Sequence, residues 1–239
     1  MKAIILAGGK GVRLLPHTAF IPKPLVPIGE KPILEIILRQ LISYGLNDIA
    51  ISVGHLSGLI EAYFQNSDIK KLAKISYVRE NKPLGTAGSL SLIKGLKDTF
   101  IVMNGDILTT LDYKKLIDFH KRAKSILTIA TYKKSVDIDL GVMETNKENI
   151  LMRYIEKPKE SFKVSMGIYV YEPAVMDYIE PGKYLDFPSL VNKLLKAGEK
   201  VMSFPFEGYW LDIGRHEDYA KAQEEFDGIK GKLFKKRGL

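Results

Sequence analysis

The sequence predicts a single α/β domain whose mainly parallel sheet is covered by helices on both faces. Short apolar runs rich in β-branched residues alternate with segments whose apolar residues recur at helical spacing, the pattern of right-handed β–α–β crossovers. Several apolar runs end in glycine or aspartate, and ligands collect beyond the carboxyl ends of parallel strands. A chain of 239 residues, 46% of them hydrophobic, is long enough for one large core and too short for two comfortable domains.

The composition narrows the class of function. No window approaches the roughly 18 apolar residues that span a bilayer, and the first apolar run is too short for a signal peptide. The absence of cysteine excludes disulfides and thiol nucleophiles, and we expect a cytoplasmic protein. The net charge of +8 suits small phosphorylated ligands. Because aromatic and basic residues are not interleaved, we expect neither nucleic acid nor membrane as a partner. The oligomeric state stays open.

The N-terminal segment leads from a strand into a loop. Residues 2–6 form an apolar run that predicts a buried strand, and a glycine-rich basic stretch follows directly. Glycines have no Cβ, so their backbone N–H groups can approach a phosphate while basic side chains add positive charge. The residues in question are Gly8, Gly9, Gly11, Lys10, Arg13 and Lys23. Neither a Walker A loop nor the dinucleotide fingerprint fits, and we interpret the stretch as phosphate-binding rather than as a plain turn.

The same stretch carries a resemblance. The sequence LAGGKGVRL followed by PKPLVPIGEKPIL resembles the signature of the sugar-nucleotide pyrophosphorylases, nucleotidyltransferases that join a nucleoside triphosphate to a sugar 1-phosphate. The resemblance implies a three-layer α/β/α, Rossmann-like nucleotidyltransferase fold with a mixed, mainly parallel central sheet, Mg²⁺ as cofactor and these two small molecules as substrates. We expect a catalytic domain over residues 1–226 and a basic C-terminal tail over residues 227–239.

The elements that follow alternate as the fold class requires. Apolar residues at helical spacing predict a helix between Pro32 and Gly45, and residues 48–53 predict a second strand. Further helices are expected at 58–64, 87–96, 113–122, 173–179, 187–197 and 216–226, and further strands at 75–79, 100–106, 126–132, 150–156, 163–171 and 201–206.

The segment at residues 80–88, ENKPLGTAG, lies between a predicted strand and a predicted helix. Gly85 would let the backbone approach a flat ligand, and Thr86 would cap the helix. Taken alone the segment is an ordinary turn, whereas the resemblance implies that it binds the base and ribose. The predicted nucleotide-binding residues are therefore Leu6, Ala7, Gly8, Gly9, Gly11, Arg13, Glu80, Pro83, Gly85, Thr86 and Asp106.

Glu80 bears on the choice of base. Thymidylyl and uridylyl relatives carry a Gln at about this place, and its amide can both donate to and accept from uracil or thymine. A carboxylate only accepts, which suits the two donors that guanine offers. The PLGTAG loop also resembles the guanylyl relatives that use mannose, heptose or aminosugar 1-phosphates. We therefore expect GTP as the nucleotide substrate. The alternative is a thymidylyl- or uridylyltransferase acting on glucose 1-phosphate. Glu80 could equally form a surface salt bridge with no role in binding the base.

Two aspartates follow apolar strands and are the candidate metal ligands. Asp106 ends the run FIVMNGD, where it could hold Mg²⁺ between phosphate oxygens or merely cap a turn. Asp212, in the segment GYWLDIGR, is the candidate second carboxylate. The predicted catalytic residues are Arg13 and Lys23, which would neutralise the triphosphate, and Asp106.

The predicted sugar-phosphate site draws on the second half of the chain. The resemblance assigns it the tripeptide Glu156-Lys157-Pro158 and a segment near Ser165, where relatives often carry Asn. The predicted residues are Lys23, Gly141, Glu156, Lys157, Ser165 and Gly167. The D-x-D triplet at 137–139 follows two lysines, and we interpret it as a solvated loop rather than a metal site. There are two competing hypotheses. One is a glycosyltransferase of similar fold, and the other is a non-catalytic sugar-nucleotide sensor or regulatory subunit.

Overall fold

The structure is a computed structural model that describes residues 1–9, 11–80 and 82–234. The main sheet holds β1 (Lys2–Ala7), β4 (Asp48–Val53), β5 (Lys74–Arg79), β6 (Phe100–Asn104), β8 (Leu127–Asp137), β11 (Lys159–Tyr171) and β12 (Val201–Phe206). The short strand pairs are β2 (Pro27–Ile28) with β3 (Lys31–Pro32), β7 (Ile107–Thr109) with β13 (Trp210–Asp212), and β9 (Val142–Thr145) with β10 (Leu151–Ile155). The α-helices are α1 (Ile33–Ser43), α2 (Ser57–Gln65), α3 (Ile69–Leu72), α4 (Gly85–Gly88), α5 (Tyr113–Ala123), α6 (Phe187–Lys196) and α7 (His216–Leu233), and 3₁₀ turns span Val12–Leu14, Lys23–Leu25, Ser89–Leu92 and Pro173–Tyr178.

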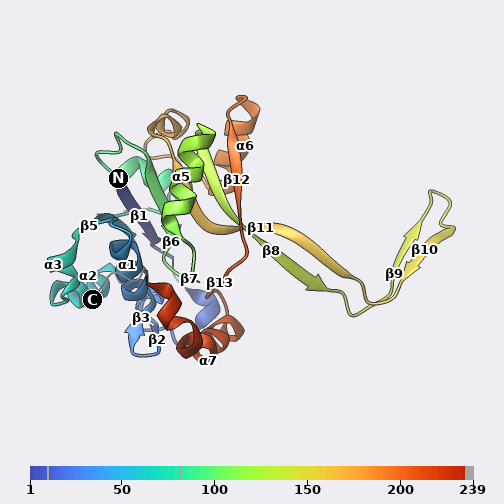
Figure 1. The fold of residues 1–239 in the computed structure, drawn as a ribbon, viewed down its shortest axis with the longest axis horizontal. Coiled ribbons are helices and arrows are strands. Elements are labelled where there is room, and N and C mark those ends of the chain that lie inside the picture. Colours follow the sequence, from blue (N-terminus) through green and yellow to red (C-terminus); the bar gives the residue numbers. More distant parts are fainter. Residues whose placement is uncertain (10, 81, 235–239) are drawn as a thin grey trace.

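The central sheet is mixed and mainly parallel, which confirms the predicted α/β class. Its strand order is β12-β8-β11-β6-β1-β4-β5, with β1 paired in parallel to both β4 and β6. Strand β11 runs antiparallel to β6 and β8, and β12 is parallel to β8. The carboxyl ends of β1, β4 and β6 therefore meet at one edge of the sheet (Figure 1).

Helices cover both faces of this sheet. Successive side chains of β1 point to opposite faces, and those on both faces are apolar and need to be covered. Ile5 packs into a core with residues of α1, α5 and α7, whereas Ile4 packs into a second core with residues of α6. All of these core side chains are buried, and burying apolar surface on both faces is what makes a parallel sheet stable. Within the part of the chain that the structure describes, no helix is long and apolar enough to cross a bilayer.

Three predicted helices differ from those in the structure, two in their bounds and one in its type. The helix expected at 87–96 is a single turn, α4, followed by a 3₁₀ turn that ends at Leu92, because the backbone at Gly88 packs against residues 183–185. Residues 173–178 form a 3₁₀ helix. Helix α7 continues seven residues past Phe226, so most of the predicted tail is helical, with Leu233 buried in the core. The remainder of that tail, residues 235–239, lies outside the described residues.

Strand β8 is longer than predicted and forms an arm with β11. The strand was expected to end at Tyr132, but it pairs with β11 as far as Asp137, which lies opposite Lys159. Asp137 is therefore the last residue of a strand and not part of a loop, and its carboxylate forms an ion pair with Lys159 at 3.1 Å. The β9–β10 hairpin extends this two-stranded ribbon further from the body of the molecule (Figure 1).

Helix α7 fixes the N-terminal hairpin formed by β2 and β3. The side-chain oxygen of Gln223 accepts a hydrogen bond from Gly29 N at 2.9 Å, and its amide nitrogen donates to Pro27 O at 2.9 Å. A Cβ at Gly29, where φ is +59°, would lie 2.8 Å from the ring of Phe226. The hairpin that follows the Lys23 turn is thus held by the last helix of the fold.

A buried histidine makes stability pH-dependent. His120 is fully buried between Thr128, 2.8 Å from Nδ1, and Glu172, 3.0 Å from Nε2. Burial lowers the pKa of His120 from its ordinary value of 6.5, against the opposing effect of Glu172. As the pH falls through 6.5, the unfolded chain takes up this proton before the folded chain, so the free energy of unfolding decreases.

Urea unfolding at pH 7 and pH 5 measures this effect. We expect wild-type protein to lose about 1.4 kcal/mol for each unit by which the folded pKa is lowered. His120→Gln is expected to be less stable at pH 7 and to lose less stability on acidification. The exposed His17 provides the control, since His17→Gln keeps the wild-type slope. An unchanged slope in His120→Gln contradicts the assignment.

Candidate functional site

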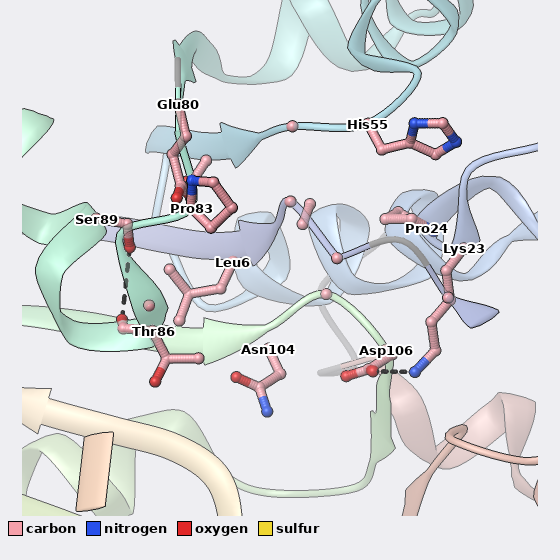
Figure 2. Close-up of a pocket in the computed structure, with 18 of the residues that line it drawn as sticks. Leu6, Lys23, Pro24, His55, Glu80, Pro83, Thr86, Ser89, Asn104 and Asp106 are labelled. Carbon is pink, nitrogen blue, oxygen red and sulfur yellow. Dashed lines mark hydrogen bonds and ion pairs between the residues drawn. The ribbon is translucent and has the colours of Figure 1, made fainter. Parts of the chain in front are cut away.

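A cleft of about 830 Å³ opens at the carboxyl ends of β1, β4 and β6. All eleven predicted nucleotide-binding residues line it, together with Lys23. The full set of lining residues is Leu6, Ala7, Gly8, Gly9, Gly11, Val12, Arg13, Lys23, Pro24, Ser52, Gly54, His55, Glu80, Lys82, Pro83, Gly85, Thr86, Ser89, Asn104, Gly105, Asp106 and Gly214. Figure 2 shows Glu80 and Pro83 at one end of the cleft, and Lys23 and Asp106 at the other.

The floor of the cleft is bare backbone. A Cβ at Gly54 would lie 2.7 Å from Gly8 O, and one at Gly105 would lie 3.1 Å from Leu6 O. Gly11 has a φ of +65°, which side chains rarely adopt. Gly54 and Gly105 are therefore required by the close approach of three strand ends, and the glycine-rich floor lets an anion approach the backbone. Lys10 lies outside the described residues.

Basic and acidic side chains meet at the far end of this floor. Lys23 Nζ forms an ion pair with Asp106 Oδ2, and both side chains are mostly buried. A Cβ on Gly214 would lie 3.8 Å from the Arg13 guanidinium and 3.7 Å from Asp212 Oδ1, so Arg13 and Asp212 flank the same glycine. Two cations and two carboxylates thus surround one point at the mouth of the glycine-rich loop.

The carboxylates suit a hard cation that is shared with substrate oxygens. Asp106 Oδ1 is buried and has no hydrogen-bond partner among the described residues. Ile213 N donates to Asp106 O at 3.0 Å, which holds Asp212 beside it although Asp212 does not line the cleft. Partial desolvation, and then the charge of Asp106, raise the pKa of the Asp212 carboxyl. No cluster of three metal-ligating side chains occurs in the described residues, so a metal here needs ligand oxygens from elsewhere.

At the opposite end, Glu80 is held in one orientation. Ser52 Oγ donates to Glu80 Oε1 and Leu84 N donates to Oε2, both at 3.0 Å. The side chain is therefore fixed in the cleft wall, and no ion pair of Glu80 is found in the described part of the chain. Thr86 does not cap a helix as predicted; its Oγ1 accepts from Phe187 N at 2.9 Å and ties the loop to α6.

The predicted sugar-phosphate residues fall into two groups. Ser165 and Gly167 lie at an irregularity in β11, where a Cβ on Gly167 would be 2.7 Å from Asn104 Nδ2 in the cleft wall. Gly141, Glu156 and Lys157 lie at the base of the β9–β10 hairpin, and none of the three lines the cleft. None of these five residues lines the cleft; Gly167 packs behind the cleft-lining Asn104, with Ser165 two residues away, and the second group lies on the arm.

Comparison with known proteins identifies the fold family. The family model described as nucleotidyl transferase matches residues 2–227. This chain belongs to the nucleotidyl transferase family. It is 36% identical to UTP–glucose-1-phosphate uridylyltransferase of Synechocystis sp., with 93% of this chain and 62% of that protein covered.

The chain is also 36% identical to mannose-1-phosphate guanyltransferase of Schizosaccharomyces pombe, over 92% of this chain and 62% of that protein. Among solved structures, it resembles HddC from Yersinia pseudotuberculosis complexed with GMP-PN, with a TM-score of 0.73 and 28% identity over 94% of this chain and 99% of that chain. The chain therefore spans about 62% of the length of these curated relatives.

Several residues of the nucleotidyl transferase cleft were missed from the sequence. Gly54 and His55 follow β4 just as the glycine-rich loop follows β1, so the end of the second predicted strand carried a usable signal. Asn104 closes β6 one residue before Gly105. Gly214 reaches the cleft only because β13 pairs with β7, a contact across 100 residues that no local pattern indicates.

Proposed function

We propose that this protein is a sugar-1-phosphate nucleotidyltransferase that forms a nucleoside diphosphate sugar and pyrophosphate from a nucleoside triphosphate and a sugar 1-phosphate. The observation that carries the proposal is that one cleft has Arg13, Lys23 and Asp106 beside its glycine-rich floor and a fixed Glu80 at its opposite end. The activities for which the uridylyl and guanyl relatives are named support it. Arg13, Lys23 and Asp106 are all present, which argues against a sensor that has lost turnover. The cytoplasmic location stays a prediction.

The proposed reaction needs alignment and charge neutralisation rather than a protein nucleophile. A phosphate oxygen of the sugar 1-phosphate attacks the α-phosphorus, the bond from that phosphorus to the bridging oxygen breaks, and pyrophosphate leaves with the electron pair. Arg13 and Lys23 neutralise the triphosphate at the glycine floor. Lys157 binds the sugar phosphate, and Gly141, Glu156, Ser165 and Gly167 contact the sugar.

Asp106 and Asp212 are the residues that would hold Mg²⁺. The buried, unpartnered Oδ1 of Asp106 and the adjacent second carboxylate fit an ion that completes its shell with substrate oxygens and water. When bound, Mg²⁺ supplies Lewis-acid stabilisation of charge on the phosphate oxygens. The ammonium of Lys23 forms an ion pair with Asp106 at the same point.

The proposed base is guanine. The Glu80 carboxylate accepts one hydrogen bond from Ser52 and one from Leu84. A carboxylate has about four acceptor sites, so acceptor sites remain for a ligand. The remaining sites suit the N1–H and 2-amino donors of guanine. The second candidate is a uridylyl- or thymidylyltransferase acting on glucose 1-phosphate, which the equal identity to the Synechocystis uridylyltransferase favours.

Pyrophosphate release is the direct test of this function. The common nucleoside triphosphates are crossed with glucose, mannose, glucosamine, N-acetylglucosamine and heptose 1-phosphates in the presence of Mg²⁺. Release that requires both substrates, greatest with GTP and a mannose- or heptose-type sugar, is expected. Release with the triphosphate alone would contradict transfer to a sugar, and release with UTP or dTTP and glucose 1-phosphate would support the second candidate.

Glu80→Gln tests the choice of base. The amide keeps the shape and one acceptor oxygen but places a donor against the guanine donors. We expect the ratio of kcat/KM for GTP to that for UTP to decrease at least about tenfold, a change of about 1.4 kcal/mol. Glu61→Gln, a change to a surface residue bonded to Arg79, serves as the control and keeps the wild-type ratio. An unchanged ratio in Glu80→Gln would reject the guanine argument.

A further inference from the structure

The arm, residues 133–164, stands apart from the core of the protein. From Lys133 onward β8 pairs only with β11, since β12 stops pairing at Tyr132. At about 3.3 Å per residue, the stretch from Lys133 to Asp137 alone carries the ribbon about 17 Å beyond the sheet. All residues of the arm are exposed or half-buried (Figure 1). A two-stranded ribbon of this kind is marginally stable at best without a covering surface.

The arm carries many exposed apolar side chains. Leu140 is 74% exposed, Met152 68%, Met143 62%, Tyr154 56% and Phe162 54%. Single exposed apolar residues are ordinary, but a concentration of them on one slender element marks a surface that another molecule covers.

The charge of the arm indicates what kind of molecule covers it. The arm holds seven basic and six acidic side chains, whereas the whole chain carries a net charge of +8. The signs alternate closely enough to pair within the arm, as in Arg153 with Glu144 at 3.5 Å. A nucleic acid or an anionic membrane would select one sign, while a balanced and partly apolar surface is complementary to another copy of itself.

The arm cannot reach its own cleft without breaking its ladder. Pairing between β8 and β11 runs without interruption from Tyr132, opposite Val164, to Asp137, opposite Lys159. β8 has no glycine or proline at which to bend in this stretch. Folding the arm back onto its own cleft would break these hydrogen bonds. Glu156 and Lys157 lie beyond the end of the ladder, so they stay away from that cleft as long as the ladder is intact.

We propose that two copies of this chain exchange arms in a two-fold symmetric dimer, so that the sugar side of each cleft is completed in trans. Lys157 of the partner subunit then meets the sugar phosphate near Asn104, Ser165 and Gly167, and the apolar surface of each arm packs on the other protomer. The inference rests on the proposed function for its substrate and on the arm alone for its dimer. A closed, isologous contact of this kind is the usual symmetry of a homodimer.

Sedimentation tests the dimer independently of activity. We expect the wild-type chain to sediment at twice its monomer mass at the concentration used for activity, and the double variant Met143→Asp/Met152→Asp to sediment as a folded monomer. Leu195→Asp removes an exposed leucine from α6 instead and is expected to stay dimeric. A wild-type monomer, or a double variant that stays dimeric, overturns the inference.

Complementation tests completion in trans. Lys157→Ala and Arg13→Ala are each expected to be nearly inactive, since each removes a substrate-binding cation. Random pairing on co-expression places the two variants together in half of the dimers, and each mixed dimer has one intact cleft, so about a quarter of the wild-type rate returns. No recovery, with mixed dimers present, overturns the inference and leaves the proposed function intact. A dimeric wild type that never turns over rejects the proposed function and leaves the dimer standing.

Discussion

Replacing Asp106 with asparagine is expected to lower kcat/KM for pyrophosphate release by at least about a thousandfold, because a preorganised charge at the reacting phosphates is lost. The amide has nearly the same shape, so the fold and the cleft should persist. Asp106 is mostly buried, its Oδ1 has no partner among the described residues, and its Oδ2 pairs with Lys23. The variant removes the carboxylate that pairs with Lys23 and would also hold the cation, and leaves Asp212 as the neighbouring negative charge.

Steady-state kinetics and thermal unfolding of the same preparation check this result. Asp98→Asn changes an exposed aspartate in the loop before β6 and is the matched control, for which wild-type rates are expected. If Asp106→Asn turned over at wild-type rates, Asp106 would have no role in the chemistry. If it failed to unfold cooperatively, the loss of activity would be structural.

Gly85→Ala is expected to destabilise the protein by about 3 kcal/mol and to lower its melting temperature by about 10 °C. Gly85 has a φ of +79°, where a Cβ is strained, and that Cβ would lie 2.5 Å from Leu185 O. The carbonyl cannot yield easily, because it accepts hydrogen bonds from Ala87 N and Gly88 N. Relief of the clash must therefore displace the loop that we propose binds the base, and triphosphate affinity should fall as well.

Gly58→Ala separates this clash from the general effect of replacing glycine. Gly58 lies in α2 and a Cβ there would meet nothing within 4 Å, so alanine should stabilise the protein by about 0.5–1 kcal/mol. Calorimetry of both variants gives the comparison. Equal melting temperatures for Gly85→Ala and wild type would show that the loop tolerates a side chain, against the close packing described.

The sequence predicts the core strands well because their signals are local. Strands β4 and β12 have the predicted bounds, since each is a short β-branched or apolar run flanked by turn residues. Strands of the arm were predicted at 150–156 and from 163 onward, but the extension of β8 was missed because Lys133 and Lys134 end its apolar run, and a strand exposed on both faces shows no alternation of apolar and polar residues. Helix α7 was cut short because two glycines follow Phe226, but burial of Leu233 outweighs their low propensity.

That the proposed nucleotide-binding residues gather in one cleft was predictable, because they follow strands of a parallel sheet whose carboxyl ends share one edge. Glu80, Gly85 and Asp106 reach one cavity for this reason, although they lie far apart in the chain. The residues proposed to bind the sugar were harder to place from the sequence, because the position of Lys157 depends on the direction of the β8–β11 ribbon. That direction follows from the register of β8 against β11, which side-chain patterns do not reveal.

The contact of Gln223 with the N-terminal hairpin sets an order for biosynthesis. Gln223 lies 194 residues after Gly29, so the ribosome completes the β2–β3 hairpin long before it makes the residue that holds this hairpin in place. At about 5–20 residues per second, the nascent chain spends about 10 to 40 seconds with this hairpin unsecured. Helix α7 must also clear the exit tunnel before it can pack, so the β2–β3 hairpin is secured only late in the synthesis of the chain.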